Sequence, residues 1–208
     1  MEYTLYNKDC IEALKDIKDN YIDLVVTSPP YDDLRSYNSI IDWKSLIFEL
    51  YRVMKDGGVV VWVVGDQVKN GGKTLSSYKQ ALYFQNIGFN MFDVIIYEKS
   101  GTAPPHKNRY FNAFEYMFVL SKGKQKTINL IKDKPNKWAG TQTFGDVTRR
   151  EKDGSLTNKG RKTIAEFGVR TNIWRYSNGK GYGTKDNIAY EHPAIFPEKL
   201  AEDHILSW

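Results

Sequence analysis

The chain has 208 residues, of which 41% are hydrophobic and 26% charged, and its net charge is +5. This length allows one domain with a sizeable core. No apolar run approaches the roughly 20 residues that a membrane-spanning helix needs, and the N-terminus lacks the pattern of a signal peptide. A single cysteine, Cys10, excludes an internal disulfide framework and a cysteine-based zinc site. We therefore expect an intracellular protein with no metal site and no membrane contact.

Positive charge is concentrated between Lys122 and Lys162, where twelve basic residues stand against four acidic ones. This segment carries +8, so the remainder of the chain carries −3. Such an asymmetry indicates a polyanionic partner, of which nucleic acid is the commonest. A solvated charged loop is the alternative interpretation.

The first 65 residues alternate between strand-like and helix-like segments. Residues 3–8 predict a short strand, and 11–17 has the apolar spacing of a helix. A second strand at 23–27 is followed by a helix over 43–55, which Asp42 precedes and Gly57-Gly58 closes. Residues 59–64 are the most strand-like of the whole chain.

The alternation continues further along the chain. A helix is predicted over 76–86, with Tyr78 on its apolar face and Gly88 after it, and 89–97 predicts the next strand. The β-α-β-α-β-α-β order favours an α/β fold, a doubly wound and mostly parallel sheet with helices on both faces.

The remaining segments predict three regions in the chain. Residues 114–121 read as a strand, whereas 122 to about 168 shows weak periodicity and is expected to be an irregular insertion. A short strand at 171–176 and a helix over 197–208, with Pro197 in its first turn, return to the core. We therefore expect a core at 1–121, an insertion at 122–170 and a return to the core at 171–208.

The strand at 23–27 stops abruptly at Ser28-Pro29-Pro30-Tyr31. Each proline lacks a backbone N–H and has a fixed φ, so the chain leaves the carboxyl end of the strand with little freedom. Open α/β sheets bind ligands at this edge. The Ser28 hydroxyl, the nearby carbonyls and the Tyr31 ring would place acceptors beside an aromatic plane, which suits a planar group bearing NH2. A stiff strand-to-loop connection is the alternative.

Five segments resemble, in order, motifs of the β-class amino DNA methyltransferases. They are Asn7–Leu14, Thr27–Tyr31, the strand after Gly57-Gly58, Glu115–Gly123, and His192–Pro197. The family transfers a methyl group from S-adenosylmethionine to N4 of cytosine or N6 of adenine in bacterial and phage DNA. The resemblance implies a cytoplasmic enzyme of restriction-modification type acting on double-stranded DNA. Ser28 as the first residue of its tetrad favours N4 of cytosine, with N6 of adenine the close alternative.

The resemblance also implies roles for individual residues. Catalysis falls to the tetrad, where Ser28 and the Pro29 carbonyl accept the amine protons, Pro30 fixes the turn and Tyr31 stacks on the flipped base. The cofactor-binding residues implied are Asp9, Cys10, His192, Pro193, Phe196 and Pro197. The DNA-binding residues implied are Arg35, His106, Arg109, Arg149, Arg150, Arg161 and Lys162.

Several of these matches have structural alternatives. Asp9 can instead cap the helix that follows it, and the 192–197 segment can be a rigid lead-in to the last helix. Phe111, Phe114 and Tyr116 match the family segment beside the flipped base, although their alternation places some of them in the core. Cys10 has no proline beside it, so it does not fit the nucleophile of a C5-cytosine enzyme, and it is either ordinary packing or at most a wall of the cofactor site.

One family motif is absent from this sequence. In the family, the helix after His-Pro-x-x-Phe-Pro is followed by a strand and then by a glycine-rich turn that approaches the cofactor. The glycines at 179–183 do not match this turn, because no apolar strand precedes them. We therefore expect this chain alone to bind S-adenosylmethionine weakly or not at all. We also expect self-association, or contact with a complementing C-terminal fragment, through the 197–208 helix and a sheet edge. The alternative functions are a catalytically silent DNA-binding module, one fragment of a split methyltransferase, and methylation of protein or RNA.

Overall fold

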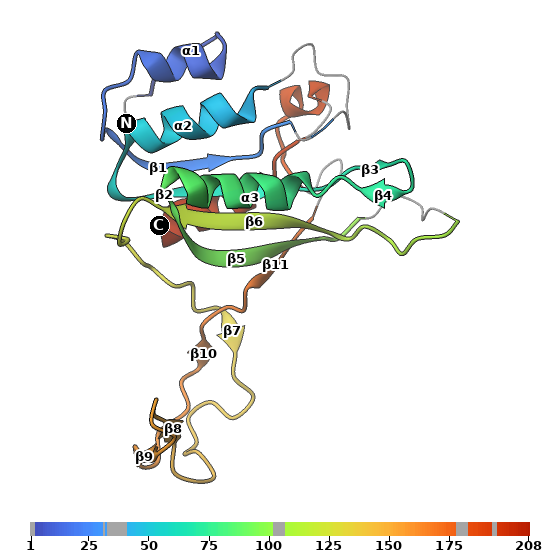
Figure 1. The fold of residues 1–208 in the computed structure, drawn as a ribbon. Coiled ribbons are helices and arrows are strands. Elements are labelled where there is room, and N and C mark those ends of the chain that lie inside the picture. Colours follow the sequence, from blue (N-terminus) through green and yellow to red (C-terminus); the bar gives the residue numbers. More distant parts are fainter. Residues whose placement is uncertain (1–2, 31, 33–40, 102–106, 178–182, 193–194) are drawn as a thin grey trace. The chain divides into compact units, whose positions relative to one another are not determined.

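The chain forms two units in a computed structural model, which describes residues 3–30, 32, 41–101, 107–177, 183–192 and 195–208 (Figure 1). The first, here called the sheet unit, comprises residues 1–129 and 172–208. The second, here called the basic unit, comprises residues 130–171. Among the described residues, no helix is long and apolar enough to cross a membrane.

The sheet unit is built on five strands in the order β1-β2-β6-β5-β11. Strands β1 and β2 are parallel, as are β5 and β11, whereas β6 runs antiparallel to both of its neighbours. The predicted α/β class with a mostly parallel sheet is therefore confirmed. The strands are β1 (Ile22–Thr27), β2 (Met54–Val64), β5 (Asn90–Lys99), β6 (Phe114–Ser121) and β11 (Ile173–Tyr176).

Helices cover both faces of this sheet. One face carries α1 (Cys10–Lys15), α2 (Trp43–Val53) and α3 (Ser76–Ile87), whose apolar residues pack with Trp62 and Phe118 in one core cluster. The other face carries α4 (Glu198–Ser207), which is drawn behind the sheet in Figure 1. There the buried His204 lies 3.3 Å from the sulfur of Met117 on β6 and stacks on Trp174 of β11. The apolar run of β2 is fully buried because both of its faces are covered.

The predicted ends of two helices agree with the structure. The Asp42 carboxylate accepts hydrogen bonds from the backbone N–H groups of Lys44 and Ser45, at 3.1 and 3.3 Å, and so caps α2. Gly88 ends α3 with a φ of 119°, a conformation that glycine adopts without strain. A short 3-10 helix at Ile188–Glu191 precedes α4.

Two predictions near the N-terminus are wrong. Residues 3–8 do not pair with any strand that the structure describes, and all of them are exposed. Gly57-Gly58 does not close a helix, because α2 ends at Val53 and β2 begins at once. Instead, Gly57 adopts a φ of 79° at an irregularity in the pairing of β1 with β2. A Cβ there would lie 2.8 Å from the carbonyl oxygen of Lys124.

The remaining strands are short. Within the sheet unit, β3 (Val68–Lys69) and β4 (Gly72–Lys73) form a small hairpin. The basic unit holds β7 (Lys134–Pro135), β8 (Thr148–Arg150), β9 (Leu156–Asn158) and β10 (Phe167–Gly168), paired as β7 with β10 and β8 with β9. Every residue from 130 to 171 is described and none is buried, so turns and backbone hydrogen bonds hold this irregular segment together.

Candidate active site

The candidate site lies at the edge of the sheet where β1 and β2 end and β6 begins. Thr27, the last residue of β1, pairs with Trp62, and Val64, the last residue of β2, pairs with Tyr116. Ser28-Pro29-Pro30 and the Gly65-Asp66 turn therefore leave the sheet at the same edge. Pro29 is buried, Ser28 and Pro30 are half-buried, and Tyr31 lies outside the described residues.

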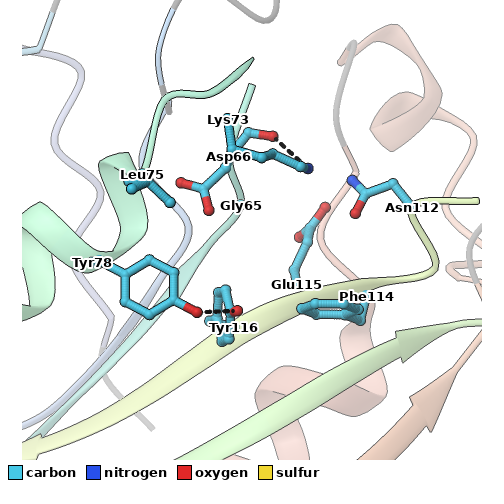
Figure 2. A pocket seen from close by; sticks show the side chains of 9 residues that line it. All are labelled: Gly65, Asp66, Lys73, Leu75, Tyr78, Asn112, Phe114, Glu115 and Tyr116. Carbon is cyan, nitrogen blue, oxygen red and sulfur yellow. Dashed lines mark hydrogen bonds between the residues drawn. The ribbon is translucent and has the colours of Figure 1, made fainter. Parts of the chain in front are cut away.

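A pocket of about 180 Å³ opens at this edge (Figure 2). Its walls come from the turn after β2, from the start of α3 and from the first residues of β6. Acidic, amide and aromatic groups dominate the lining, so the pocket offers hydrogen-bond acceptors beside ring faces. The lining residues are Gly65, Asp66, Lys73, Leu75, Tyr78, Asn112, Phe114, Glu115 and Tyr116.

The Asp66 carboxylate is fixed by the start of α3. It accepts hydrogen bonds from the backbone N–H and the hydroxyl of Ser77, both at 2.9 Å. The residue at the N-cap of α3, Leu75, has a left-handed φ of 55° and offers no side-chain cap. Asp66 thus satisfies a helix N–H group that the sequence of α3 itself leaves uncapped, and the positive end of the helix dipole favours its charge.

Asp32 ties the turn after the Ser-Pro-Pro-Tyr tetrad to the same segment. Its carboxylate accepts hydrogen bonds from the hydroxyl of Thr74 (2.6 Å), the backbone N–H of Gln67 (3.3 Å) and the hydroxyl of Ser76. Partial burial acts to raise the pKa of Asp32, but the bonds from Ser76 and Thr74 outweigh it and hold this pKa below its ordinary value. The tetrad and the pocket wall are therefore joined through one ionised side chain.

Two tyrosines form the aromatic wall of the pocket. The hydroxyl oxygens of Tyr78 and Tyr116 lie 2.7 Å apart, and the Phe114 ring meets Tyr116 edge-on at 5.4 Å (Figure 2). Burial, with the hydrogen bond to Tyr78, raises the pKa of Tyr116 to about 12, so this hydroxyl stays neutral at physiological pH. Glu115 is paired with Lys99 at 3.1 Å, which balances its charge.

The predicted cofactor-binding residues lie at the start of α1 and before α4. Asp9 caps α1 by accepting from the backbone N–H groups of Ile11 (2.9 Å) and Glu12 (3.2 Å), so its capping interpretation is correct. Cys10 as a whole residue is exposed. The pKa of its thiol is raised, mainly because the surrounding protein partly desolvates it and also because the charge of Asp9 is nearby.

The second group of predicted cofactor-binding residues precedes α4. His192 is exposed and ends the short 3-10 helix, Phe196 is half-buried, and Pro197 is buried one residue before the first residue of α4. Pro193 lies outside the described residues. The structure therefore shows a lead-in to α4 at these positions, and their role toward a cofactor remains a prediction.

The predicted DNA contacts divide between the two units. Arg109, in the sheet unit, donates a hydrogen bond to the carbonyl of Gly71, and Arg35 and His106 lie outside the described residues. The four predicted contacts of the basic unit are exposed, and they are Arg149, Arg150, Arg161 and Lys162.

Several residues at this site were not predicted to be functional, among them Asp66, Tyr78 and Asn112 of the pocket lining and Asp32 beside it. Asp66 directly follows a terminated strand and Asp32 follows the tetrad, so the sequence did carry a signal for both. Tyr78 was assigned to the apolar face of its helix, but the structure turns its ring toward Tyr116 at the pocket (Figure 2). Asn112 lies within the 111–116 segment that the resemblance places beside the flipped base, but nothing in the sequence singled out this residue.

The chain is similar in sequence to known DNA methylases. A family model for DNA methylases (N6_N4_Mtase) matches residues 22–208. The orphan methyltransferase M.BamHII of Bacillus amyloliquefaciens is 55% identical over 93% of this chain and 74% of its own length. The type II methyltransferase M.BglII of Bacillus subtilis is 27% identical over 98% of this chain. The chain spans 55% of M.BglII, about half of that relative's length.

A solved structure shares the fold. The PvuII DNA methyltransferase (cytosine-N4-specific) superposes with a TM-score of 0.66 at 18% sequence identity. The match covers 97% of this chain and 68% of that protein. At this identity the likeness concerns the arrangement of helices and strands.

Proposed function

Because the chain belongs to the N6_N4_Mtase family of DNA methylases, we propose that it methylates an exocyclic amino group of a DNA base, with cytosine N4 favoured over adenine N6. The observation that carries this proposal is that the Ser28-Pro29-Pro30 turn and the acceptor-lined pocket lie at the same edge of the sheet, where hydrogen bonds of Asp32 connect the two segments. Ser28 as the first residue of the tetrad supports the choice of cytosine. The setting is the bacterial cytoplasm, in a modification system like those of the type II relatives.

The tetrad would hold the amino group. An exocyclic amine is a poor nucleophile because its lone pair is conjugated into the ring, so it must be held while nitrogen pyramidalises. The Ser28 hydroxyl and the Pro29 carbonyl accept its two N–H groups, and the fixed φ of the prolines keeps both acceptors in place. Alignment and fixed dipoles then supply most of the acceleration, as is usual when both reactants are bound.

The pocket would receive the base itself. A base must leave the duplex stack at a cost of a few kcal/mol before its amine can react. The rings of Tyr116 and Phe114 offer stacking surfaces, and Asp66 and Asn112 offer groups for the polar edge of the base. At about 180 Å³ the pocket is smaller than the sites that hold drug-sized ligands, which suits one planar ring system.

S-adenosylmethionine is the methyl donor that the family implies, and when bound it supplies an activated methyl group. The residues assigned to it fit only in part. Asp9 and Cys10 are exposed and Asp9 already caps α1, so these side chains do not by themselves enclose a small molecule. We expect isothermal titration of this chain to give a dissociation constant weaker than micromolar, and micromolar binding would contradict that expectation.

Duplex DNA would be held by the basic unit. Its 42 residues include ten basic and five acidic side chains, a net +5 that equals the charge of the whole chain. The basic unit makes up most of residues 122–170, the insertion expected from the sequence. This segment would act as the target-recognition segment, with cationic contacts to phosphates.

The test is transfer of a labelled methyl group to duplex DNA. Ser28→Ala should lower the rate by at least about 100-fold, the usual cost of losing one positioned hydrogen-bond partner at a reacting group. Ser45→Ala, an exposed serine of α2, is the matched control and should leave the rate unchanged. Equal rates for Ser28→Ala and wild type would overturn the proposal. Digestion of the product to nucleosides would then distinguish N4-methylcytosine from N6-methyladenine.

A catalytically silent DNA-binding module is the second candidate. It is favoured by the exposure of Asp9 and Cys10, two of the residues predicted to bind the methyl donor. Duplex binding without any methyl transfer, even at saturating S-adenosylmethionine, would establish it. Salt-dependent binding to duplex DNA that survives competition by RNA would argue against an RNA substrate.

Self-association, or capture of a complementing fragment, would use α4 and the edge of β1. Ile205 and Leu206 of α4 are exposed, and β1 pairs only with β2 among the strands that the structure describes. Sedimentation should show a mass that rises with concentration. A monomer at all concentrations would count against this contact.

A further inference from the structure

The basic unit displays an aromatic pair that no core explains. Phe144 is 92% exposed and Trp138 is 54% exposed, with their ring centroids 6.4 Å apart and nearly perpendicular. No residue of the basic unit is buried, so these rings do not form the centre of a hydrophobic core. Large exposed apolar side chains in a polar segment mark a surface for a partner.

Cationic side chains lie on a segment that is hydrogen-bonded to the chain around Phe144. The backbone N–H of Thr143 donates to the carbonyl of Lys162 at 3.0 Å, and that of Val147 donates to the carbonyl of Gly160 at 2.9 Å. These bonds place the chain around Phe144 beside the chain that carries Arg161 and Lys162. The Lys137 ammonium lies 5.3 Å from the centre of the Trp138 ring.

The charges of this surface are available to a ligand. Within the part of the chain that the structure describes, Lys137, Arg161 and Lys162 form no salt bridge, whereas Arg170 is paired with Asp133. Protein-binding surfaces are depleted in lysine, while aromatic rings interleaved with cations are typical of surfaces that stack on nucleic-acid bases. The occupant that matches both features is a polyanion with exposed planar rings.

Resting on the proposed function, we infer that Phe144 and Trp138 stack on DNA bases that have lost their stacking partners, while Lys137, Arg161 and Lys162 contact the flanking phosphates. We call these five residues the stacking surface. Extrusion of a base leaves its former neighbours without a stacking partner, and apolar side chains commonly insert at such steps. The basic unit thereby recognises opened duplex as well as charge.

The experiment measures binding to two 30-base-pair duplexes, one fully paired and one with a central single-base bulge, over a series of salt concentrations. Wild-type protein should bind the bulged duplex more tightly. Phe144→Ala should weaken binding to the bulged duplex by roughly 5-fold to 150-fold, the loss expected for one base stack. The slope of log affinity against log salt should not change, because no phosphate contact is removed.

Three further variants separate stacking from charge and from folding. Phe144→Trp keeps a ring and should restore the preference for the bulge. Leu156→Ala removes an apolar side chain of the same unit that is 60% exposed, and should have no effect. The double change Arg161→Gln and Lys162→Gln should weaken binding to both duplexes and lower the salt slope by about 1.8, since each phosphate contact contributes about 0.9.

The possible failures are distinct. If Phe144→Ala binds the bulged duplex as wild type does, or loses no more than Leu156→Ala, the stacking inference is overturned while the proposed function stands. The same holds if Phe144→Ala changes the salt slope. If the wild-type chain binds neither duplex and transfers no methyl group, both this inference and the proposed function are overturned.

Discussion

The two units of this protein are stabilised in different ways. In the sheet unit, β2 is buried along its apolar run between two layers of helices, and the unit has no net charge. The basic unit has no buried residue and carries a net +5, so its own conformation rests on turns, short ladders and a few ion pairs. Hydrophobic burial therefore fixes the conformation of the sheet edge, whereas the basic unit has no core that could fix its conformation in the same way.

The largest contrast should appear in native-state hydrogen exchange. The amide of Val61, in the centre of the sheet, should exchange only by global unfolding, at a cost of the order of 5–15 kcal/mol. The amide of Val147 is bonded to the carbonyl of Gly160 at 2.9 Å but lies in the coreless unit, and it should open at a small fraction of that cost. Mass spectrometry of peptic fragments would measure both. Equal protection would show that the two units unfold together.

The same residue type can be compared across the two units. Trp62 is fully buried, meets Phe84 edge-on at 5.0 Å and donates its indole N–H to Gln80 at 2.8 Å. Trp62→Ala should lower the free energy of unfolding by about 3–5 kcal/mol. Trp138→Ala, at an exposed ring, should change it by less than about 0.5 kcal/mol. Urea denaturation would measure both values, and similar losses would mean that Trp138 is part of a core.

The smallest expected effect concerns two carboxylates, one in each unit. Removing the charge of Asp32 by Asp32→Asn should lower the free energy of unfolding by about 1 kcal/mol at pH 7, because hydrogen bonds at the start of α3 are weakened. The folded-state pKa of Asp32 lies below its ordinary value. Its contribution is therefore present above about pH 4 and is lost as the pH falls through the folded-state pKa.

The control for this change is Asp153→Asn in the basic unit. The side chain and backbone of Ser155 hold the pKa of Asp153 below its ordinary value, but the residue is exposed on a turn outside any core. This variant should leave the denaturation midpoint unchanged at every pH. In urea titrations, the difference in the free energy of unfolding between wild type and Asp32→Asn should become smaller below about pH 4. A difference that stays constant with pH would contradict the lowered folded-state pKa of Asp32.

Particular elements show how far sequence reasoning reached. The runs at 59–64 and 114–121 predicted central strands because burial on both faces demands continuous apolar residues, and Asp42 and Gly88 marked helix ends through local backbone chemistry. The strand expected at 3–8 did not form, since a strand needs a partner that no local pattern specifies. Gly57 was assigned to a helix end, although a pairing irregularity between distant strands is what requires its positive φ.

Some features of the candidate site could likewise be predicted from the sequence, and others could not. The sequence by itself determined the rigid Ser28-Pro29-Pro30 turn and the concentration of charge in the basic unit, because proline geometry and net charge are local properties. Only the tertiary structure decided that Asp66 and Asp32 fix the start of α3 and that Tyr78 meets Tyr116 in one wall of a pocket. Those contacts join residues that stand from 11 to 44 positions apart, and it is the packing of the sheet that brings them together.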